Sequence, residues 1–462
     1  MLTLVFKEGD VSSVLSIYKA KASFIDAVEI RLDLLQWDLE QIRFLRNKIS
    51  HPVVFTDKWD ALTEEKKAFI FSYLPLTPTF VDFEESIEES FWQECRKKFP
   101  KIRWILSYHN YQKTPKNLFS IFTSIEKRKS DLIKIACHCK NSLDALRMFE
   151  VARAIPSEKR IFVPMGIKGK WLRSLSFIFK NPFTYVACAN KEKAFGQFSL
   201  EEFRKKALHT LHPKTQVYAL LGSPVYQSIG DIFHNKTLKD QNGYYVKILV
   251  KKEELFPFLE KAKNLPFQGF SITMPLKETA HSYCLKENTL RTKFSVNTLK
   301  KIKGKFYGFN TDGSSCLDLI EEKGFQGFPL VILGPGGASK AIGILAKERG
   351  YKVYFMGRNG KELKALKNLG CEVFSFSKKV SSFSKAILVN GTPIGMDKKS
   401  LPVPEEFFSS KWLVFDLIYS PRKTPLIQKA QEKNCQVIVG KSLFIRQAEK
   451  QQKIWFSKKI DE

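Results

Sequence analysis

The sequence predicts an α/β protein in two parts: a (β/α)8 barrel, followed by a two-lobed α/β unit whose second lobe is Rossmann-like. Three observations support this prediction. The first part contains eight strand-like runs, most of them followed by a helix-length amphipathic stretch. A short polar segment with a proline, 209–215 (HTLHPKT), is typical of a linker. The strand pattern then restarts and reaches 331–342 (VILGPGGASKAI), which reads as a strand, a tight turn and a helix start.

The composition indicates a globular protein without a membrane segment. The chain has 462 residues, of which 44% are hydrophobic and 13% aromatic, enough for two to four domains. No run reaches the roughly 18 uncharged apolar residues of a spanning helix, and the N-terminus enters a strand, so we expect a cytoplasmic protein. The eight cysteines lack paired spacing, so we expect reduced thiols and no metal site.

The net charge of +29 raises the question of a nucleic-acid partner. The lysines are dispersed in short pairs such as Lys66-Lys67 and Lys251-Lys252, without a basic tail. We therefore favour a generally lysine-rich surface and expect no nucleic acid to bind. A basic nucleic-acid-binding protein is kept as a remote alternative, which steep salt-dependent retention of DNA would support.

The strand runs of residues 1–211 are evenly spaced, which favours a closed barrel over an open doubly wound sheet. They cover residues 2–6, 27–33, 53–56, 79–84, 103–109, 131–138, 160–165 and 185–189. In such a barrel the catalytic groups stand at the C-terminal strand ends and face inward.

Polar residues near these strand ends share one parity. They are Glu29 and Arg31, Asp82 and Glu84, Ser107 and His109, and Lys134 with His138. A lysine inside an apolar strand is costly unless it is paired or used. We expect burial to lower the pKa of Lys134 toward that of a nucleophilic amine, the alternative being a structural salt bridge at the barrel mouth.

The second part divides into a substrate lobe, 216–312 with the last helix in 425–462, and a nucleotide lobe, 313–424. We expect strands at 218–221, 244–250 and 269–273, then a hairpin within 295–310. The site should lie in the cleft between the two lobes.

The glycine-rich loop predicts a dinucleotide site. Gly334, Gly336 and Gly337, followed by Ala338, allow a sharp turn and close approach of a pyrophosphate to a helix N-terminus. The next strand, 352–356, is followed by Arg358 and Asn359 rather than by the acid typical of NAD sites. A cation suits a 2′-phosphate, so the expected cofactor is NADP.

Five ordered motifs of the first part resemble those of type I 3-dehydroquinate dehydratases. They are 29–33 (EIRLD), 107–111 (SYHNY) with 114–115 (TP), 131–136 (DLIKIA), 165–166 (MG) with Gly169 and Arg173, and 196–197 (GQ). The resemblance implies that Lys134 forms a Schiff base with the substrate ketone and that His109, oriented by Glu84, moves the proton. The residues implied to hold substrate hydroxyls and carboxylate are Glu29, Arg31, Lys58, Arg173 and Gln197.

The first part also departs from that family. Lys58 stands where the family usually has an arginine, and the Glu-Gly-Gly turn that usually follows is absent. Lys193 and Phe195 stand where a serine and a proline are usual. These departures motivate an alternative, in which the dehydratase site has decayed and only a shikimate or quinate dehydrogenase is active.

The motifs of the second part resemble, in order, those of shikimate dehydrogenases. They are 222–224 (GSP) with Ser228 and 234–235 (HN), 272–275 (ITMP) with Lys277, 296–298 (VNT), 308–312 (GFNTD), 334–338 (GPGGA), 390–396 (NGTPIGM), 416–419 (DLIY) and 447–448 (QA). A reduced ketone needs a cation and a proton donor, which Lys277 tethered to Asp312 would supply. The residues implied to contact substrate are Ser228, Thr273, Asn297, Tyr419 and Gln447, and the further cofactor contacts are Thr392 and Gly440.

The two resemblances imply consecutive steps of the shikimate pathway. Dehydration of 3-dehydroquinate gives 3-dehydroshikimate, which NADPH reduces to shikimate, so one product is the next substrate. We expect a monomer or homodimer. In the loop 227–231 (QSIGD) the family usually has serine at position 230, so Gly230 removes one carboxylate donor, and we expect Asp231 to point to solvent.

Overall fold

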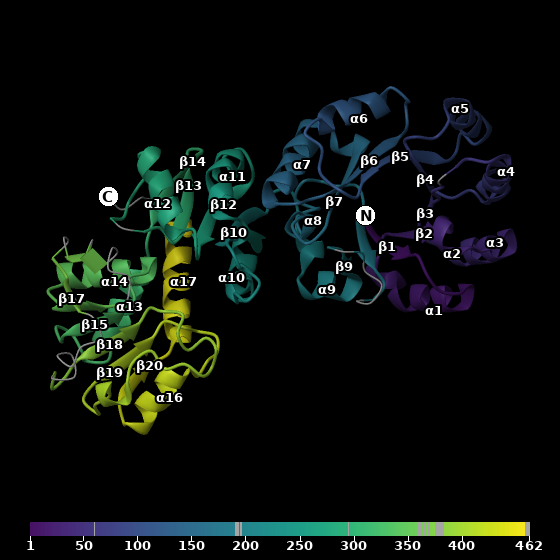
Figure 1. Ribbon diagram of the computed structural model, residues 1–462. Helices are drawn as coiled ribbons and strands as arrows, with labels where there is room; N and C mark the ends of the chain where they lie inside the picture. The colour runs from purple at the N-terminus through teal and green to yellow at the C-terminus, as the bar shows by residue number, and fades with distance from the viewer. Residues whose placement is uncertain are drawn as a thin grey trace. The chain divides into compact units, whose positions relative to one another are not determined.

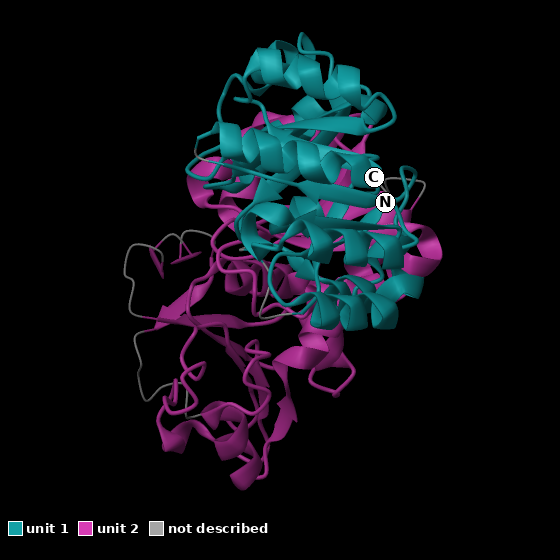
Figure 2. Cartoon of the chain, turned by 90° about the vertical axis from the view of Figure 1, so that its right-hand side faces the viewer, with its two compact units in different colours: residues 1–215 teal, residues 216–462 magenta. Residues whose placement is uncertain are grey.

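The chain folds into two compact units, residues 1–215 and 216–462, coloured separately in Figure 2. The computed structural model describes residues 1–59, 61–189, 194, 196–293, 295–357, 363–364, 366–367, 370–374 and 383–457. Four residues that the sequence singles out lie outside the described residues: Lys193, Phe195, Arg358 and Asn359.

Strands and helices alternate along the first unit (Figure 1). Its strands are β1 (Leu2–Phe6), β2 (Ala27–Arg31), β3 (Val53–Thr56), β4 (Phe80–Glu84), β5 (Arg103–Asn110), β6 (Leu132–His138), β7 (Arg160–Met165), β8 (Thr184–Ala187) and β9 (Phe198–Ser199). Its α-helices are α1 (Val11–Lys21), α2 (Leu32–Leu35), α3 (Leu39–Lys48), α4 (Glu64–Tyr73), α5 (Glu89–Lys98), α6 (Leu118–Glu126), α7 (Ser142–Ala154), α8 (Lys170–Arg173) and α9 (Leu200–Lys205).

Several of these helices begin where a short polar side chain caps the first backbone amides. The capping residues are Asp10 for α1, Asp38 for α3, Thr63 for α4, Asn141 for α7 and Ser199 for α9. Each accepts a hydrogen bond from an amide that the helix itself leaves unpaired. The strand-to-helix boundaries are therefore encoded locally.

The strands form one parallel sheet in the order β7-β6-β5-β4-β3-β2-β1-β8-β9, with β1 between β2 and β8. The eight expected strands are confirmed to within two residues at each end, and the barrel fold class is confirmed. The side chain of Asn181 joins β7 to the residue before β8 through hydrogen bonds. Its Oδ1 accepts from the Phe162 amide, and its Nδ2 donates to the carbonyl oxygens of Phe162 and Phe183.

The barrel interior changes from apolar to polar along the strands. The lower layer is an apolar cluster of Val54, Phe80, Ile105, Leu132, Ile161, Phe183 and Tyr185. The next inward positions are polar, as in the series Phe80, Asp82 and Glu84 of β4. Because parallel strands all end at one rim, this layering gathers the polar groups at the C-terminal mouth.

The second unit contains two sheets. Its strands are β10 (Gln216–Gly222), β11 (Gly243–Leu249), β12 (Phe267–Ile272), β13 (Thr298–Ile302), β14 (Lys305–Phe309), β15 (Leu330–Leu333), β16 (Val353–Met356), β17 (Glu372–Phe374), β18 (Ile387–Asn390), β19 (Leu413–Asp416) and β20 (Gln436–Ile438). Its α-helices include α10 (Gly230–Leu238), α11 (Leu255–Ala262), α12 (Lys277–Lys286), α13 (Asp312–Glu321), α14 (Gly337–Glu348), α16 (Pro425–Glu432) and α17 (Gly440–Phe456).

The first sheet has the order β11-β10-β12-β13-β14 and ends in the expected antiparallel hairpin. The second is parallel in the order β17-β16-β15-β18-β19-β20, the arrangement of a dinucleotide-binding sheet. We expected the chain to return to the substrate lobe from residue 425, but β20 pairs with β19 in the second sheet. The return therefore begins only with α17.

Helix α17 ties the second unit together. Its Trp455 packs on Tyr218 of β10, with ring centroids 4.8 Å apart, and its Gln451 donates to the carbonyl oxygen of Asn297. It also contacts α13, which leads into the second sheet. Among the described residues, no helix combines the length and apolar character needed to cross a bilayer.

Candidate active sites

Lys134 of β6 lies inside the barrel between two carboxylates. Its Nζ is 2.7 Å from Asp82 Oδ2 and 3.5 Å from Glu29 Oε1, and it lies 4.6 Å from the ring centre of Tyr185. Burial alone would lower the pKa of Lys134, but the charges of the Asp82 and Glu29 carboxylates outweigh it and raise this pKa well above 10.5. The expectation of a lowered pKa was therefore wrong, because two buried acids accompany the lysine.

The carboxylates are themselves held by hydroxyl groups. Ser107 of β5 donates to Asp82, and Thr56 donates to Glu29 at 2.8 Å. Ser107 and Thr56 lie at or near the C-terminal ends of their strands and face the barrel interior. This position and parity could have identified Thr56 from the sequence. Together the two hydroxyls fix the two acids on either side of the Lys134 amine.

His109 forms a second group with Glu84 and Lys58. Glu84 Oε1 lies 2.8 Å from His109 Nδ1 and 2.5 Å from Lys58 Nζ. Burial would raise the pKa of Glu84, but the hydrogen bond and charge of His109 and the Lys58 charge lower it to about 2. Burial lowers the pKa of His109, and the charges of Lys134 and Lys58 lower it further. The hydrogen bond and charge of Glu84 act in the opposite direction and raise it. Burial thus favours the neutral, proton-accepting form of His109, although the Glu84 carboxylate opposes this effect.

Tyr111 covers this group, a contact that the sequence did not reveal. Its ring is stacked on His109 with centroids 5.8 Å apart, and its hydroxyl accepts a hydrogen bond from Lys58 Nζ at 3.3 Å. It is the last residue of the SYHNY motif, and its side chain is largely exposed. Lys58, although it departs from the family pattern, is therefore part of the His109 group.

The remaining barrel residues provide cations and an amide. Arg31 pairs with Asp33 through two hydrogen bonds of 2.9 and 2.6 Å. Arg173 is buried, and burial lowers its pKa to about 10 despite the charge of Glu29. Among the described residues, no side chain forms a hydrogen bond with the Arg173 guanidinium, so this buried cation is suited to an anionic ligand. Gln197 is buried and accepts from the Ala194 amide at 3.1 Å.

In the second unit Lys277, at the start of α12, meets Asp312 at the start of α13. The two atoms Nζ and Oδ2 are 2.5 Å apart. Asn297 donates from Nδ2 to Asp312 Oδ1 and to the Thr311 hydroxyl, both at 2.9 Å. The aspartate is buried, so its orientation is fixed by Asn297 while its other oxygen holds the lysine.

Gln447 extends this network from α17. Its Oε1 lies 3.5 Å from Asn297 Nδ2, and its carbonyl oxygen accepts from the Thr311 hydroxyl. Tyr419 packs against Phe444 of α17, with ring centroids 5.5 Å apart. The sequence-predicted residues Lys277, Asp312, Asn297 and Gln447 are thus brought together through direct contacts.

Ser228 and Thr273 belong to the loops after β10 and β12. These loops adjoin, because the Thr273 amide donates to the carbonyl oxygen of Leu221 and the Ser223 amide donates to that of Met274. The Ser228 hydroxyl accepts from the Gly230 amide at 3.1 Å. No direct contact joins Ser228 or Thr273 to the Lys277–Asp312 pair in the described part of the chain.

Asp231 does not point to solvent as expected. Its side chain is only 14% exposed, and its Oδ1 lies 3.1 Å from Lys247 Nζ. Lys247 stands on β11, a strand that carries no motif, so no pattern in the sequence indicates this ion pair.

The glycine-rich loop lies directly beside Lys277. A Cβ on Gly337 would be 3.7 Å from Lys277 Cβ, and Ser295 donates to the Gly337 carbonyl oxygen. Gly334 has a φ of +82°, and a side chain there would meet Thr392 Cγ2 at 2.7 Å. Helix α14 begins at Gly337 after Gly336, which is exposed and provides no side-chain cap.

These features fit a dinucleotide phosphate. The amides at the start of α14, including that of Ala338, have no side-chain cap. The loop that precedes them is rich in glycine, so a phosphate can approach them closely. The Ser339 hydroxyl is buried without a hydrogen-bond partner among the described residues. Thr392 Oγ1 instead donates to Asn390, and Gly440 packs its Cα against the Ile418 carbonyl group, so Gly440 has a packing role at the start of α17.

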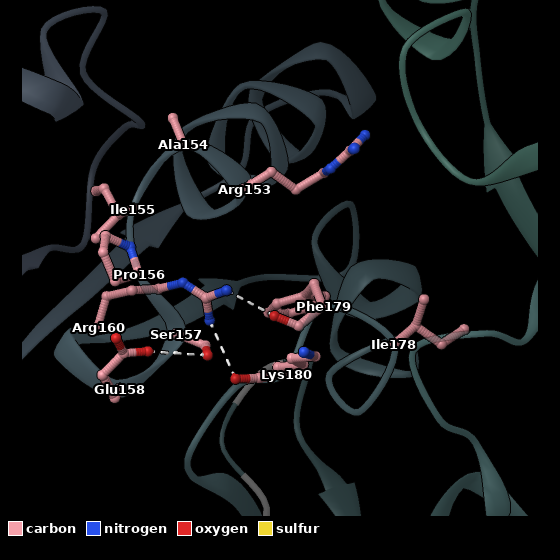
Figure 3. A pocket seen from close by; sticks show the side chains of 10 residues that line it. All are labelled: Arg153, Ala154, Ile155, Pro156, Ser157, Glu158, Arg160, Ile178, Phe179 and Lys180. Atoms are coloured by element: carbon pink, nitrogen blue, oxygen red, sulfur yellow. Dashed lines mark hydrogen bonds between the residues drawn. The ribbon is translucent and has the colours of Figure 1, made fainter.

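A surface cavity of about 480 Å³ in the first unit contains none of the predicted site residues in its lining (Figure 3). It is lined by the end of α7, the start of β7 and the segment 178–180, and Arg160 in its wall donates to the carbonyl oxygens of Ala152, Phe179 and Lys180. This is the N-terminal end of the barrel strands, which serves stability rather than catalysis. Within the described ranges, no group of three or more His, Cys, Asp or Glu side chains could hold a metal ion.

Two families match this chain in consecutive segments. Type I 3-dehydroquinase matches residues 5–215, and the shikimate dehydrogenase substrate binding domain matches residues 220–299.

Curated relatives extend the match over both units. The chloroplastic bifunctional 3-dehydroquinate dehydratase/shikimate dehydrogenase of Arabidopsis thaliana is 30% identical over 489 residues, covering 96% of this chain and 79% of the relative. The shikimate biosynthesis protein AroDE of Chlamydia pneumoniae is 30% identical over 444 residues, covering 94% and 90%. A shikimate dehydrogenase (NADP(+)) of Dictyoglomus thermophilum is 32% identical over 259 residues, covering 53% and 94%. The chain therefore belongs to the family of bifunctional 3-dehydroquinate dehydratase/shikimate dehydrogenase proteins.

Proposed function

We propose that the protein catalyses two consecutive steps of the shikimate pathway, dehydration of 3-dehydroquinate and NADPH-dependent reduction of 3-dehydroshikimate to shikimate. The observation that carries this proposal is the coexistence of two separate groups, Lys134 with His109 and Lys277 with Asp312, in a chain similar along its length to bifunctional relatives. Each group contains the amine and the acid or base that its reaction needs.

In the first step Lys134 acts as the nucleophile. Its amine, once deprotonated, adds to the ketone carbon, and loss of water gives an iminium that acidifies the neighbouring C–H bond. His109 takes that proton as a base and returns it to the departing hydroxyl, and hydrolysis of the remaining iminium by water releases the enone product and regenerates the Lys134 amine. Glu84, ionised because of its low pKa, orients the imidazole, and Lys58 keeps the pair in place.

Substrate in the barrel would be held by the charged residues around Lys134. Arg173 is the best candidate for the carboxylate, because it is buried and its guanidinium has no side-chain hydrogen bond among the described residues. Glu29 and Gln197 provide oxygen and amide groups for hydroxyls, and Arg31 is kept oriented by Asp33.

In the second step the Lys277 ammonium group, paired with Asp312, donates a proton to the oxygen of the carbonyl group that is reduced. Gly334, Gly336, Gly337 and Ala338 would hold the NADP pyrophosphate, and the bound nicotinamide supplies the hydride. Lys277 lies beside Gly337 and so adjoins the cofactor loop, while Asp312 fixes the amine. Asn297 holds Asp312, Gln447 contacts Asn297, and both side chains offer polar atoms to substrate hydroxyls.

Two spectrophotometric assays of the full chain test this function. With 3-dehydroquinate alone, the absorbance of the conjugated enone of 3-dehydroshikimate should rise. With shikimate and NADP⁺, NADPH should form. Absence of the first signal with retention of the second would favour the alternative of a decayed dehydratase, and absence of both would refute the proposal.

We further propose that Arg358 and Asn359 select NADPH over NADH, that the protein acts in the cytoplasm, and that it is a monomer or homodimer. The Arg358 guanidinium suits a 2′-phosphate. Replacing Arg358 by serine should reduce kcat/KM for NADPH at least tenfold and leave that for NADH nearly unchanged. Light scattering of the purified chain would settle the oligomeric state.

A further inference from the structure

Lys247 holds together the loop that enters α10. From near the carboxyl end of β11, its Nζ donates to the carbonyl oxygens of Tyr226 at 3.3 Å and Ser228 at 3.0 Å, and it forms the 3.1 Å ion pair with Asp231. Two of the three N–H donors of the ammonium group serve the two carbonyl oxygens, and its contact with Asp231 is an ion pair. The lysine side chain is only 20% exposed, so these contacts hold it in a fixed position against the loop before α10.

Gly230, next to the Lys247 contacts, lies beside two hydroxyl groups. A Cβ on Gly230 would lie 3.2 Å from the Ser228 hydroxyl and 3.5 Å from the Tyr245 hydroxyl. Tyr245 is on the same face of β11 as Lys247, two residues earlier. Two hydroxyl groups, one cation and one carboxylate therefore lie close together around Gly230, with Tyr245 almost fully buried beneath them.

In the proposed reaction, the substrate carboxylate has to bind away from Lys277 and Asp312, and the Ser228 loop is a candidate place. Lys277 and Asp312 must face the oxygen that is reduced, so the substrate carboxylate has to be bound elsewhere, by the remaining donors. The Ser228 hydroxyl is such a donor, whereas Tyr245 is almost fully buried behind it. A carboxylate bound there would be repelled by Asp231 if the aspartate charge were not neutralised.

We propose that Lys247 is a positioning residue for shikimate recognition, which fixes the Ser228 loop and cancels the charge of Asp231 where the substrate carboxylate binds. This inference rests on the proposed reductase function. The Lys247–Asp231 pair adds no net charge, so the Ser228 hydroxyl can bind the anion without net repulsion from the aspartate. Specificity for a carboxylated ring would then depend on an ion pair between a strand and a helix start.

The test uses the full chain and compares shikimate with its neutral methyl ester. Lys247→Met should raise KM for shikimate about ten- to a hundredfold, with a much smaller change in kcat, because the Lys247 charge no longer offsets that of Asp231 and the Ser228 carbonyl oxygen loses this donor. KM for the ester should change less than threefold. Asp231→Asn should lower KM for shikimate, and the double variant Lys247→Met/Asp231→Asn should recover most of the loss.

Lys236→Met is the matched control, since Lys236 is an exposed lysine of α10, and it should behave as the natural protein. Equal losses for shikimate and its ester in Lys247→Met, or no recovery in the double variant, would overturn the proposed charge role. If the natural protein oxidises neither compound, the reductase function itself fails, which is a distinct result. Thermal unfolding of each variant establishes that it is folded.

Discussion

Lys134 and Asp82 form a buried 2.7 Å ion pair across the barrel interior, and Ser107 of the strand between them donates to the other oxygen of Asp82. The strand register places Ser107 beside Lys134 on one side and beside Glu84 on the other. The amine that must act as a nucleophile is therefore stored in its protonated form.

Asp82→Asn should lower the pKa of Lys134, because the closest negative charge is removed. Borohydride reduction with 3-dehydroquinate should fix an adduct on the Lys134 peptide, and the pH midpoint of adduct formation should move to lower pH in Asp82→Asn. Below the midpoint, the rate should rise about tenfold for each unit by which the pKa falls. Ser107→Ala keeps the charge and should leave the midpoint in place. A midpoint unchanged by Asp82→Asn would show that Asp82 does not control the amine.

Lys58→Met should shift the pH dependence of dehydration toward higher pH. The Lys58 charge contributes to the lowered pKa of His109, so its loss raises that pKa and more alkaline conditions are needed for a neutral base. The acid limb of kcat/KM for 3-dehydroquinate should move upward, whereas Lys58→Arg should retain it. A shift in the opposite direction would indicate that His109 does not act as the base in the free enzyme.

Lys134→Ala and Lys277→Ala should separate the two activities. Each amine belongs to its own group, with its own acid, so Lys277→Ala should reduce shikimate formation by about 10²- to 10⁴-fold and leave dehydration intact. Lys134→Ala should have the reverse effect. Both variants are assayed with 3-dehydroquinate and with shikimate, and loss of both activities in a folded variant would contradict separate sites.

Gly230→Ser should change the preference between shikimate and quinate. A Cβ at position 230 fits beside the Ser228 and Tyr245 hydroxyls with only a few tenths of an ångström of adjustment, so a serine can add a carboxylate donor there. We expect the natural protein to prefer shikimate and to oxidise quinate detectably. The serine should tighten shikimate about ten- to a hundredfold in KM and suppress quinate. An unchanged ratio would place residue 230 away from the carboxylate.

The sequence predicted most of the fold because its strands carry local signals. Apolar runs ending in polar residues located all eight barrel strands, and parity placed Glu84, His109 and Lys134 on the inner face. The end of the nucleotide sheet was missed, because β20 is a strand of three residues with an exposed first position and little periodicity.

The site was less predictable where contacts join distant, motif-free positions. The pKa of Lys134 depends on Asp82, which lies 52 residues earlier in the chain and whose distance no pattern reveals. Asp231 pairs with Lys247 from a strand without a motif, so its burial could not be foreseen. Lys58 departs from the family pattern, and only the folded barrel brings it into contact with Glu84 and Tyr111.

The central claim is that both sites act in one chain, and a coupled assay tests it most directly. Purified protein is given 3-dehydroquinate and NADPH, and absorbance of NADPH is followed while shikimate is measured by chromatography. The account predicts NADPH consumption that depends on 3-dehydroquinate, equimolar with shikimate, and abolished by Lys134→Ala unless 3-dehydroshikimate is added. No consumption from 3-dehydroquinate by a protein that still reduces 3-dehydroshikimate would contradict it.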